Sequence, residues 1–244
     1  MASLAWVIGP PISFFLAMSV SYQALFIIDG SLYLIIAVLG QLLPKLEHET
    51  KQDTEEKGYI FKNKSVIFLF ICIMLTGISF TGYNTTMPLY VINQMGLSEK
   101  LPGYLLAIAA FLEMPLMMCT AYFAKKINLK LIISVGIVGL IVFHIIYGHI
   151  TTPYQFMVLQ FLPALYIASV HAMGMVYFQE LLPKIPGQAT SLFLNAFMMG
   201  QILGGLLLSI ARDGDFSPVF TASAVIALIG LVFLIAVKKT EQIR

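Results

Sequence analysis

The feature that most constrains this chain is a series of long apolar segments. Eight of them cover residues 3–19, 22–43, 64–92, 102–124, 129–149, 154–179, 187–211 and 217–237. A helix of about 20 apolar residues spans the hydrocarbon core of a bilayer. None of the segments shows the alternating polarity of a membrane β-strand. We therefore expect an all-α polytopic membrane protein with eight transmembrane helices.

Composition supports this class and argues against others. Hydrophobic residues make up 59% of the chain and charged residues 11%, which is too little charge to cover a soluble domain. The sequence has no phosphate-binding glycine loop, nucleophile–base pair or zinc motif, so we expect neither an enzyme nor a cofactor or metal. The formal charge of +2 gives no sign of a nucleic-acid partner. Cys72 and Cys119 lie in apolar segments and are expected to be free thiols.

One charged segment divides the chain. Residues 44–63 contain ten Lys, Glu, Asp and His residues, which cannot enter hydrocarbon at acceptable cost. We interpret this segment as a solvated linker. It separates two expected helices in residues 1–43 from six in residues 64–244.

The distribution of basic residues predicts the orientation, because cytoplasmic loops of membrane proteins are enriched in Lys and Arg. If the linker is cytoplasmic and the helices alternate, twelve basic residues lie inside, and only Lys100 and Arg212 lie outside. We therefore expect both termini of this chain in the cytoplasm. The twelve are Lys45, Lys51, Lys57, Lys62, Lys64, Lys125, Lys126, Lys130, Lys184, Lys238, Lys239 and Arg244.

Polar residues inside apolar segments are costly and therefore informative. Residues 64–92 carry a stripe at helical spacing, which we interpret as a cavity-lining face together with Asn84. The alternative is that these hydroxyls bond carbonyls of their own helix. The stripe consists of Thr76, Ser79, Tyr83 and Thr86.

Glu113 is the sharpest single candidate, because it lies in the middle of the segment 102–124. An ionised carboxylate at that depth needs a partner, water or a raised pKa. It would serve as a proton carrier or as an acceptor for the hydroxyls of a polyol. The alternative is a structural carboxyl bonded to a neighbouring helix.

Two further segments carry candidate binding residues. Gln160 and His171 share a helical stripe in residues 154–179, although a lone buried His is more often a packing residue. Gln188, Ser191 and Asn195 form an inward stripe in residues 187–211, and Asn195 is expected to line a cavity.

Small and isolated residues give weaker signals. Gly200 and Gly204 are spaced for close approach of another helix. Residues 129–149, with His144, and residues 217–237 are plain by comparison, and we expect both helices to face lipid. Asp29 lies in residues 22–43, and we assign it no role.

Four stretches together resemble the sugar efflux transporters of the major facilitator superfamily. They are Ser-Leu-Ala-Trp-Val-Ile-Gly-Pro-Pro at 3–11, Met-Pro-Leu-Tyr at 87–90 with Met-Gly-Leu at 95–97, Ala-Ala-Phe-Leu-Glu-Met-Pro at 109–115, and Gly-Met-Val-Tyr-Phe-Gln-Glu-Leu-Leu-Pro at 174–183. Each stretch alone is weakly specific. Their order and spacing along essentially the whole chain carry the resemblance.

The resemblance implies twelve helices in two halves joined by a cytoplasmic loop. This chain fits helices five to twelve of that pattern. Residues 1–43 then form the last two helices of the N-terminal half, residues 44–63 the central loop, and residues 64–244 the C-terminal six-helix half. A four-helix N-terminal segment is an implied partner. The loop at 124–130 lacks the acid that the superfamily pattern has between helices eight and nine.

The resemblance also implies export of small sugars or glycosides across the bacterial inner membrane, coupled to protons. With the polar stripes, it leads to the hypothesis of alternating access between two halves around a site near the middle of the membrane. Glu113 is the candidate for proton coupling. The alternatives are a multidrug or other proton antiporter and a non-transporting truncated membrane fragment. The candidate sugar-binding residues are Tyr83, Asn84, Gln160, His171 and Asn195.

Overall fold

The computed structural model describes residue 16 and residues 20–41, 63–212 and 214–238. Seven helices in this part of the chain are long and apolar enough to cross a membrane. The described residues contain no strand, only an isolated bridge between Arg212 and Asp215. The prediction of an all-α polytopic membrane protein is confirmed. The expected first helix at 3–19 and nearly all of the linker at 44–63 lie outside the described residues.

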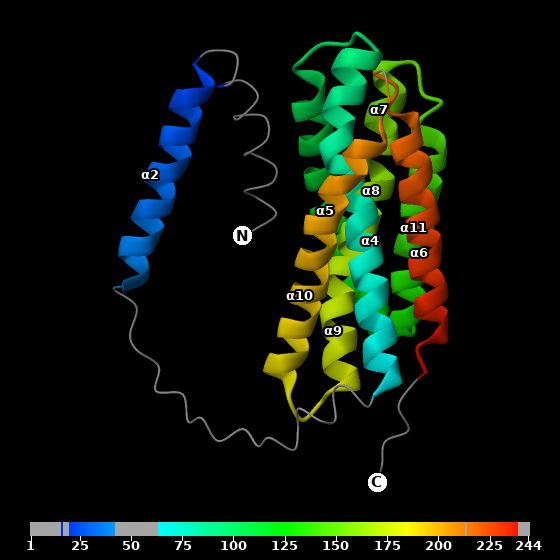
Figure 1. Ribbon diagram of the computed structural model, residues 1–244. Helices are drawn as coiled ribbons and strands as arrows, with labels where there is room; N and C mark the ends of the chain where they lie inside the picture. Colours follow the sequence, from blue (N-terminus) through cyan, green and yellow to red (C-terminus); the bar gives the residue numbers. More distant parts are fainter. Residues whose placement is uncertain (1–15, 17–19, 42–62, 213, 239–244) are drawn as a thin grey trace.

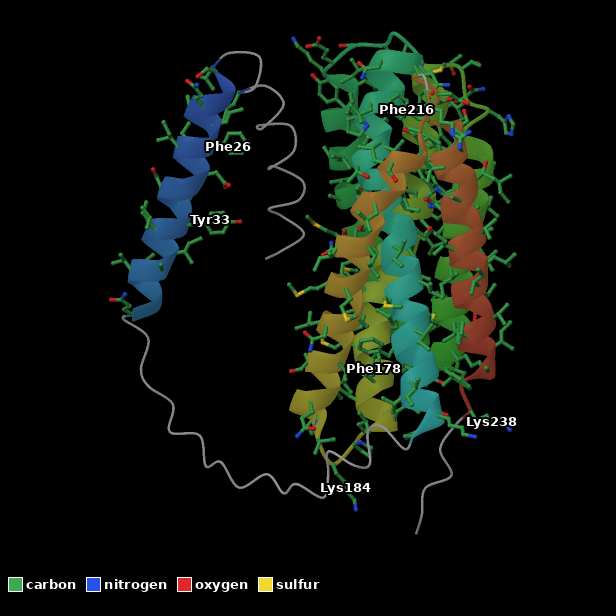
Figure 2. All side chains as sticks on the ribbon, viewed as in Figure 1. Phe26, Tyr33, Phe178, Lys184, Phe216 and Lys238 are labelled. Atoms are coloured by element: carbon green, nitrogen blue, oxygen red, sulfur yellow. The ribbon has the colours of Figure 1, made fainter. Side chains whose placement is uncertain are left out.

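The helix α2 (Tyr22–Gln41) stands apart from the other helices in Figure 1. Its large apolar side chains are exposed, including Phe26 and Tyr33, which Figure 2 labels. Asp29 is also exposed on this helix. A helix that is apolar on all sides and exposed suits a lipid or protein environment rather than water.

The remaining helices form a bundle whose six spans agree with the expected segments. The first span is α4 (Lys64–Leu89) with the π-helix η1 (Tyr90–Gln94), followed by α5 (Leu101–Ala124) and α6 (Leu129–Tyr147). The fourth span is broken into α7 (Pro153–Leu159), α8 (Phe161–Tyr166), the π-helix η2 (Ile167–His171) and α9 (Ala172–Leu181). The last two are α10 (Pro186–Gly204) with the 3-10 helix η3 (Gly205–Ile210), and α11 (Ser217–Ala236).

Local residues explain where several helices begin. The side chain of Asn63 accepts hydrogen bonds from the backbone of Ser65 and Val66 at the start of α4. Asn128 does the same for Lys130 at the start of α6. Thr152 and Gln155 form a reciprocal capping box at α7. Such caps satisfy backbone N–H groups that have no partner within the helix.

The break in the fourth span follows from Pro163. Proline has no backbone N–H, so it cannot bond the carbonyl of Leu159 four residues earlier. The α-helix is interrupted between those two residues, at Gln160. The π-helix η2 begins four residues after Pro163. π-helical turns in membrane and soluble helices often lie at functional sites.

Glycines bring α10 into backbone contact with α4, which lies between α10 and α11 (Figure 1). A Cβ built on Gly200 of α10 would come 3.0 Å from Cα of Gly77 and would clash with the carbonyl of Met74. A Cβ on Gly204 would lie 2.7 Å from the carbonyl oxygen of Ile78. The predicted close approach at these two glycines is confirmed.

The expectation that α6 and α11 face lipid describes only one face of each helix, because each also buries polar side chains inside the bundle. His144 of α6 is only 2% exposed, and its Nε2 lies 2.9 Å from the hydroxyl oxygen of Ser79 on α4. Ser223 of α11 is also fully buried. α11 packs on α4 and α6, α6 packs on α11 and α8, and both helices leave large apolar side chains exposed on another face. The sequence showed few polar residues in these helices, but it did not show the partner of His144, which lies 65 residues away.

The two ends of the bundle differ in their connections. Lys184, in the connection between α9 and α10, and Lys238, after α11, lie at the same end in Figure 2, opposite Phe216. This arrangement follows from spans that alternate in direction. It places two of the twelve basic residues that we expect inside at one end of the molecule.

Candidate binding cavity

A cavity of about 210 Å³ lies between α4, α5, α8, η2 and α10. Two helices bordering it, α4 and α10, are in direct backbone contact, and α5 closes the wall from another side through its contacts with α8 and η2. The lining residues are Phe80, Tyr83, Asn84, Leu106, Ala109, Ala110, Glu113, Pro163, Ala164, Ile167, His171, Phe197 and Gln201.

Four helical segments each contribute one strongly polar side chain to this cavity. These are Asn84 from α4, Glu113 from α5, His171 from η2 and Gln201 from α10. The two amides offer both donors and acceptors, the carboxyl group can accept or carry a proton, and the imidazole can do either. Such a small set of convergent polar groups in a mainly apolar cavity is typical of small-molecule sites.

Aromatic rings form part of the cavity wall and are held in place by packing on other rings. The ring of Phe80 packs 5.1 Å from that of Tyr166, which is fully buried. Elsewhere in the wall, the ring of His171 from η2 packs edge to face on the ring of Phe197 from α10, with centroids 4.5 Å apart and planes at 77°. Aromatic pairs in these geometries stabilise each other beyond simple contact. The His171 imidazole is therefore held by ring packing in its position at the cavity.

Tyr83 and Gln160 are linked, but only Tyr83 lines the cavity. The Tyr83 hydroxyl donates to Oε1 of Gln160 at 2.8 Å, and Nε2 of Gln160 donates to the carbonyl of Phe156 at 3.1 Å. Gln160 is fully buried. The structure therefore places Gln160 behind the wall, where its amide holds the phenol of Tyr83. The Tyr83 ring also packs edge to face on Phe143 at 4.6 Å.

Asn195 is not among the lining residues. It is exposed on α10, and so is Ser191 of the same stripe, whose hydroxyl donates to the carbonyl of Gly187 in its own helix. Sequence reasoning missed Gln201, which lies on the same helix and does line the cavity. Helical spacing shows which residues share a face, but it does not show which face meets the neighbouring helices.

Most of the polar stripe on α4 is packed rather than cavity-lining. Thr76, Ser79 and Thr86 are fully buried and do not border the cavity. Thr76 donates to the carbonyls of Cys72 and Ile73 in its own helix. This is the alternative that the sequence left open for such hydroxyls. Of that stripe, only Tyr83 reaches the cavity, next to Asn84.

Comparisons with known proteins agree with this architecture. Residues 1–153, more than half of the chain, match the family model of the Major Facilitator Superfamily. The chain therefore belongs to this superfamily of membrane transport proteins, a family of transporters rather than enzymes.

Within it, the chain is similar to curated sugar efflux transporters. It is 32% identical over 238 residues to sugar efflux transporter B of Salmonella typhimurium, covering 96% of the chain and 60% of the relative. It is 31% identical over 241 residues to sugar efflux transporter A of Escherichia coli, covering 97% and 61% respectively. Sugar efflux transporter C of Escherichia coli is 31% identical over 207 residues, which are 83% of the chain and 52% of the relative. The chain thus spans about 60% or less of the length of these relatives.

Proposed function

We propose that this chain is part of a transporter that exports small sugars or glycosides across the bacterial inner membrane, and that the described cavity contributes to the sugar site. The observation that carries the proposal is the convergence of Asn84, Glu113, His171 and Gln201 on a cavity with aromatic walls. Sugars present hydroxyl groups around the ring and apolar C–H faces, which match amide and carboxyl groups and aromatic rings respectively. The names of the curated relatives point to the same substrate class.

The proposed organisation follows the charge pattern and the resemblance. Residues 1–43 form the last two helices of an N-terminal half, residues 44–63 a cytoplasmic central loop, and residues 64–244 the C-terminal half. Twelve basic residues on one side support cytoplasmic termini. A facing helical half, to which a four-helix segment preceding this pattern would belong, completes the cavity as a partner.

Transport then proceeds by alternating access, with the two halves rocking around the site. Glu113 exchanges a proton as the cavity opens to each side, and sugar and proton move in opposite directions. His171 also borders the cavity, and its imidazole can bind and release a proton. Both groups come from segments that meet through the contact of α5 with η2, so a proton on either changes the charge that the other experiences.

Binding is tested on the purified full chain in detergent with radiolabelled lactose. We expect Asn84→Ala and Gln201→Ala each to weaken binding by about tenfold, the cost of losing a well-placed hydrogen bond to a substrate hydroxyl. The matched control is Thr85→Ala, because the neighbouring Thr85 hydroxyl bonds Thr81 in its own helix. Equal affinity of the two cavity variants and the control would contradict a sugar site here.

Proton coupling is tested in liposomes that contain the chain together with the four-helix N-terminal segment of a sugar efflux transporter and carry an imposed pH gradient. We expect the gradient to drive labelled lactose across the membrane, and Glu113→Gln to abolish this movement while lactose binding in detergent persists. Gradient-driven movement that survives the substitution would remove Glu113 from proton coupling. Binding without movement in any condition would support the non-transporting alternative.

A second candidate function is a multidrug proton antiporter. It is favoured by the apolar majority of the cavity wall, which includes Phe80, Ile167 and Phe197. Competition in the lactose binding assay separates the two functions. Displacement of radiolabelled lactose by unlabelled sugar but not by tetraphenylphosphonium, a lipophilic cation, supports sugar export. Binding of radiolabelled tetraphenylphosphonium that unlabelled sugar does not displace, without binding of lactose, supports the antiporter.

A further inference from the structure

We propose that Thr120 of α5 is a positioning residue that holds the π-helical turn η2, and through it sets the place of His171 in the cavity wall. This inference rests on the proposed function only in that His171 borders the proposed sugar site. Its experiment measures geometry and needs no bound sugar, so it can fail or succeed independently.

The first observation is a hydrogen bond between two spans. The Thr120 hydroxyl lies 3.1 Å from the carbonyl oxygen of Ala168 in η2, and 3.0 Å from that of Met117 in its own helix. Thr120 is only 7% exposed, and Ala168 is fully buried. The hydroxyl thus donates between the two carbonyls and ties α5 to the π-helical turn in apolar surroundings, where water cannot take its place.

The second observation is a close contact on the other side of the same turn. A Cβ built on Gly136 of α6 would lie 2.7 Å from Cβ of Ser169 and 3.4 Å from Cα of Tyr166. Only glycine lets the two backbones approach this closely. The turn is therefore held from α5 by a hydrogen bond and from α6 by the close packing of Gly136 against Ser169.

The geometry of η2 explains why this support affects the cavity. A π-helical turn contains one residue more than the α-helical turn it replaces, so it changes the angular position of the residues that follow. His171 is the last residue of the turn. Its ring packs on Phe193 and Phe197 and borders the cavity. A turn that relaxes toward a regular α-helix would rotate His171 away from this position.

The experiment measures the accessibility of position 171 by thiol labelling of the purified full chain. The parent carries His171→Cys and Cys119→Ser, because Cys119 is exposed whereas Cys72 is fully buried. The reagent is a small, water-soluble methanethiosulfonate, and the result is the rate of modification. Thr120→Val removes the hydroxyl at nearly constant volume, and Thr120→Ser retains it. A second parent with Asn84→Cys reports on the cavity wall from α4.

We expect Thr120→Val to change the rate at position 171 by about fivefold, the shift in population that loss of one hydrogen bond allows. Thr120→Ser should restore the parent rate, and the rate at position 84 should not change. An unchanged rate at position 171 in the Val variant would overturn the inference. Equal changes at positions 171 and 84 would also overturn it, because they would indicate general loosening. A Thr120→Ser variant with the same changed labelling rate at position 171 as Thr120→Val would also overturn the inference.

Discussion

The helices α4 and α5 both border the cavity, yet they differ in how the rest of the protein surrounds them. In the most apolar stretch of the α4 span, 44% of residues are buried, against 17% in α5. α4 packs mainly between α10 and α11, whereas α5 packs mainly on α8 and η2. Phe111 and Met118 of α5 are 65% and 75% exposed. Apolar length therefore predicts that a helix crosses the membrane, but not whether it is central or peripheral.

The difference extends to the polar side chains. On α4, Ser79 and Tyr83 are bound to side chains of other helices, so their hydroxyls are committed to the fold. On α5, Glu113 is partly exposed and borders the cavity. Ser79 and Tyr83 on the more enclosed helix therefore contribute to structure through these bonds, whereas Glu113 on the more open helix is partly accessible. Four substitution experiments test this comparison.

The largest effect is expected for truncation of a buried methionine on α4. Met87 is fully buried, and Met87→Ala should lower the free energy of unfolding by about 2–5 kcal/mol through lost packing and a new cavity. The matched control is Met118→Ala on α5, which should change it by less than about 0.5 kcal/mol. Denaturant titration in mixed micelles, followed by circular dichroism, measures both. Similar losses in the two variants would contradict the comparison.

A smaller loss is expected where α10 meets α4. Gly200→Ala places a Cβ against the backbone of Met74 and Gly77, and overpacking of this kind costs about 1–3 kcal/mol. Gly205→Ala is the control, because a Cβ there meets nothing within 4 Å. The same titration compares them. If Gly200→Ala were as stable as the control, the backbone contact between α10 and α4 would not be close.

The hydrogen bond between Ser79 and His144 should contribute about 1 kcal/mol. A double-mutant cycle with Ser79→Ala and His144→Phe isolates the energy of this hydrogen bond. Each single variant leaves one buried partner without the other, whereas the double variant removes both partners. We expect the sum of the losses in unfolding free energy of the two single variants to exceed the loss in the double variant. Strict additivity would show that α6 is held to α4 by packing alone.

The smallest effect concerns the end of η1, where Nε2 of Gln94 donates to Oδ1 of Asp215 at 3.1 Å. The backbone N–H of Ser217, its side chain and Gln94 donate to the Asp215 carboxylate and hold its pKa below the ordinary 3.8. This lowered pKa adds stability that is present above the ordinary value and is lost as the pH falls through the folded value. The unfolding midpoint should therefore fall more steeply below about pH 4 in the parent than in Asp215→Asn. Parallel curves would contradict this role.

The sequence predicted the spans of the bundle within a few residues, because apolar length, caps and prolines are local signals. Residues 64–92 were expected and Lys64–Gln94 is found, and residues 187–211 correspond to Pro186–Ile210. The close approach at Gly200 was also readable, since glycine spacing lies within one helix. These features depend on neighbours in sequence.

The candidate site was predicted only in part. Tyr83, Asn84, Glu113 and His171 border one cavity, whereas Gln160 lies behind its wall. Asn195 and Gln201 show the reason. Helical spacing shows which residues share a face, but it does not show which neighbouring helix that face contacts. The burial of His144 depends on Ser79 from a distant segment, and only the packed structure shows that pairing.

The glycine contacts between α4 and α10 decide which polar side chains of the cavity come from directly packed helices. A Cβ on Gly200 would lie 3.0 Å from Cα of Gly77, so the backbones of α4 and α10 are in contact there. Asn84 and Gln201, the two amides that border the cavity, belong to these two packed helices. Glu113 belongs to the less enclosed α5, so the carboxyl group of the cavity comes from a helix outside this glycine-packed pair.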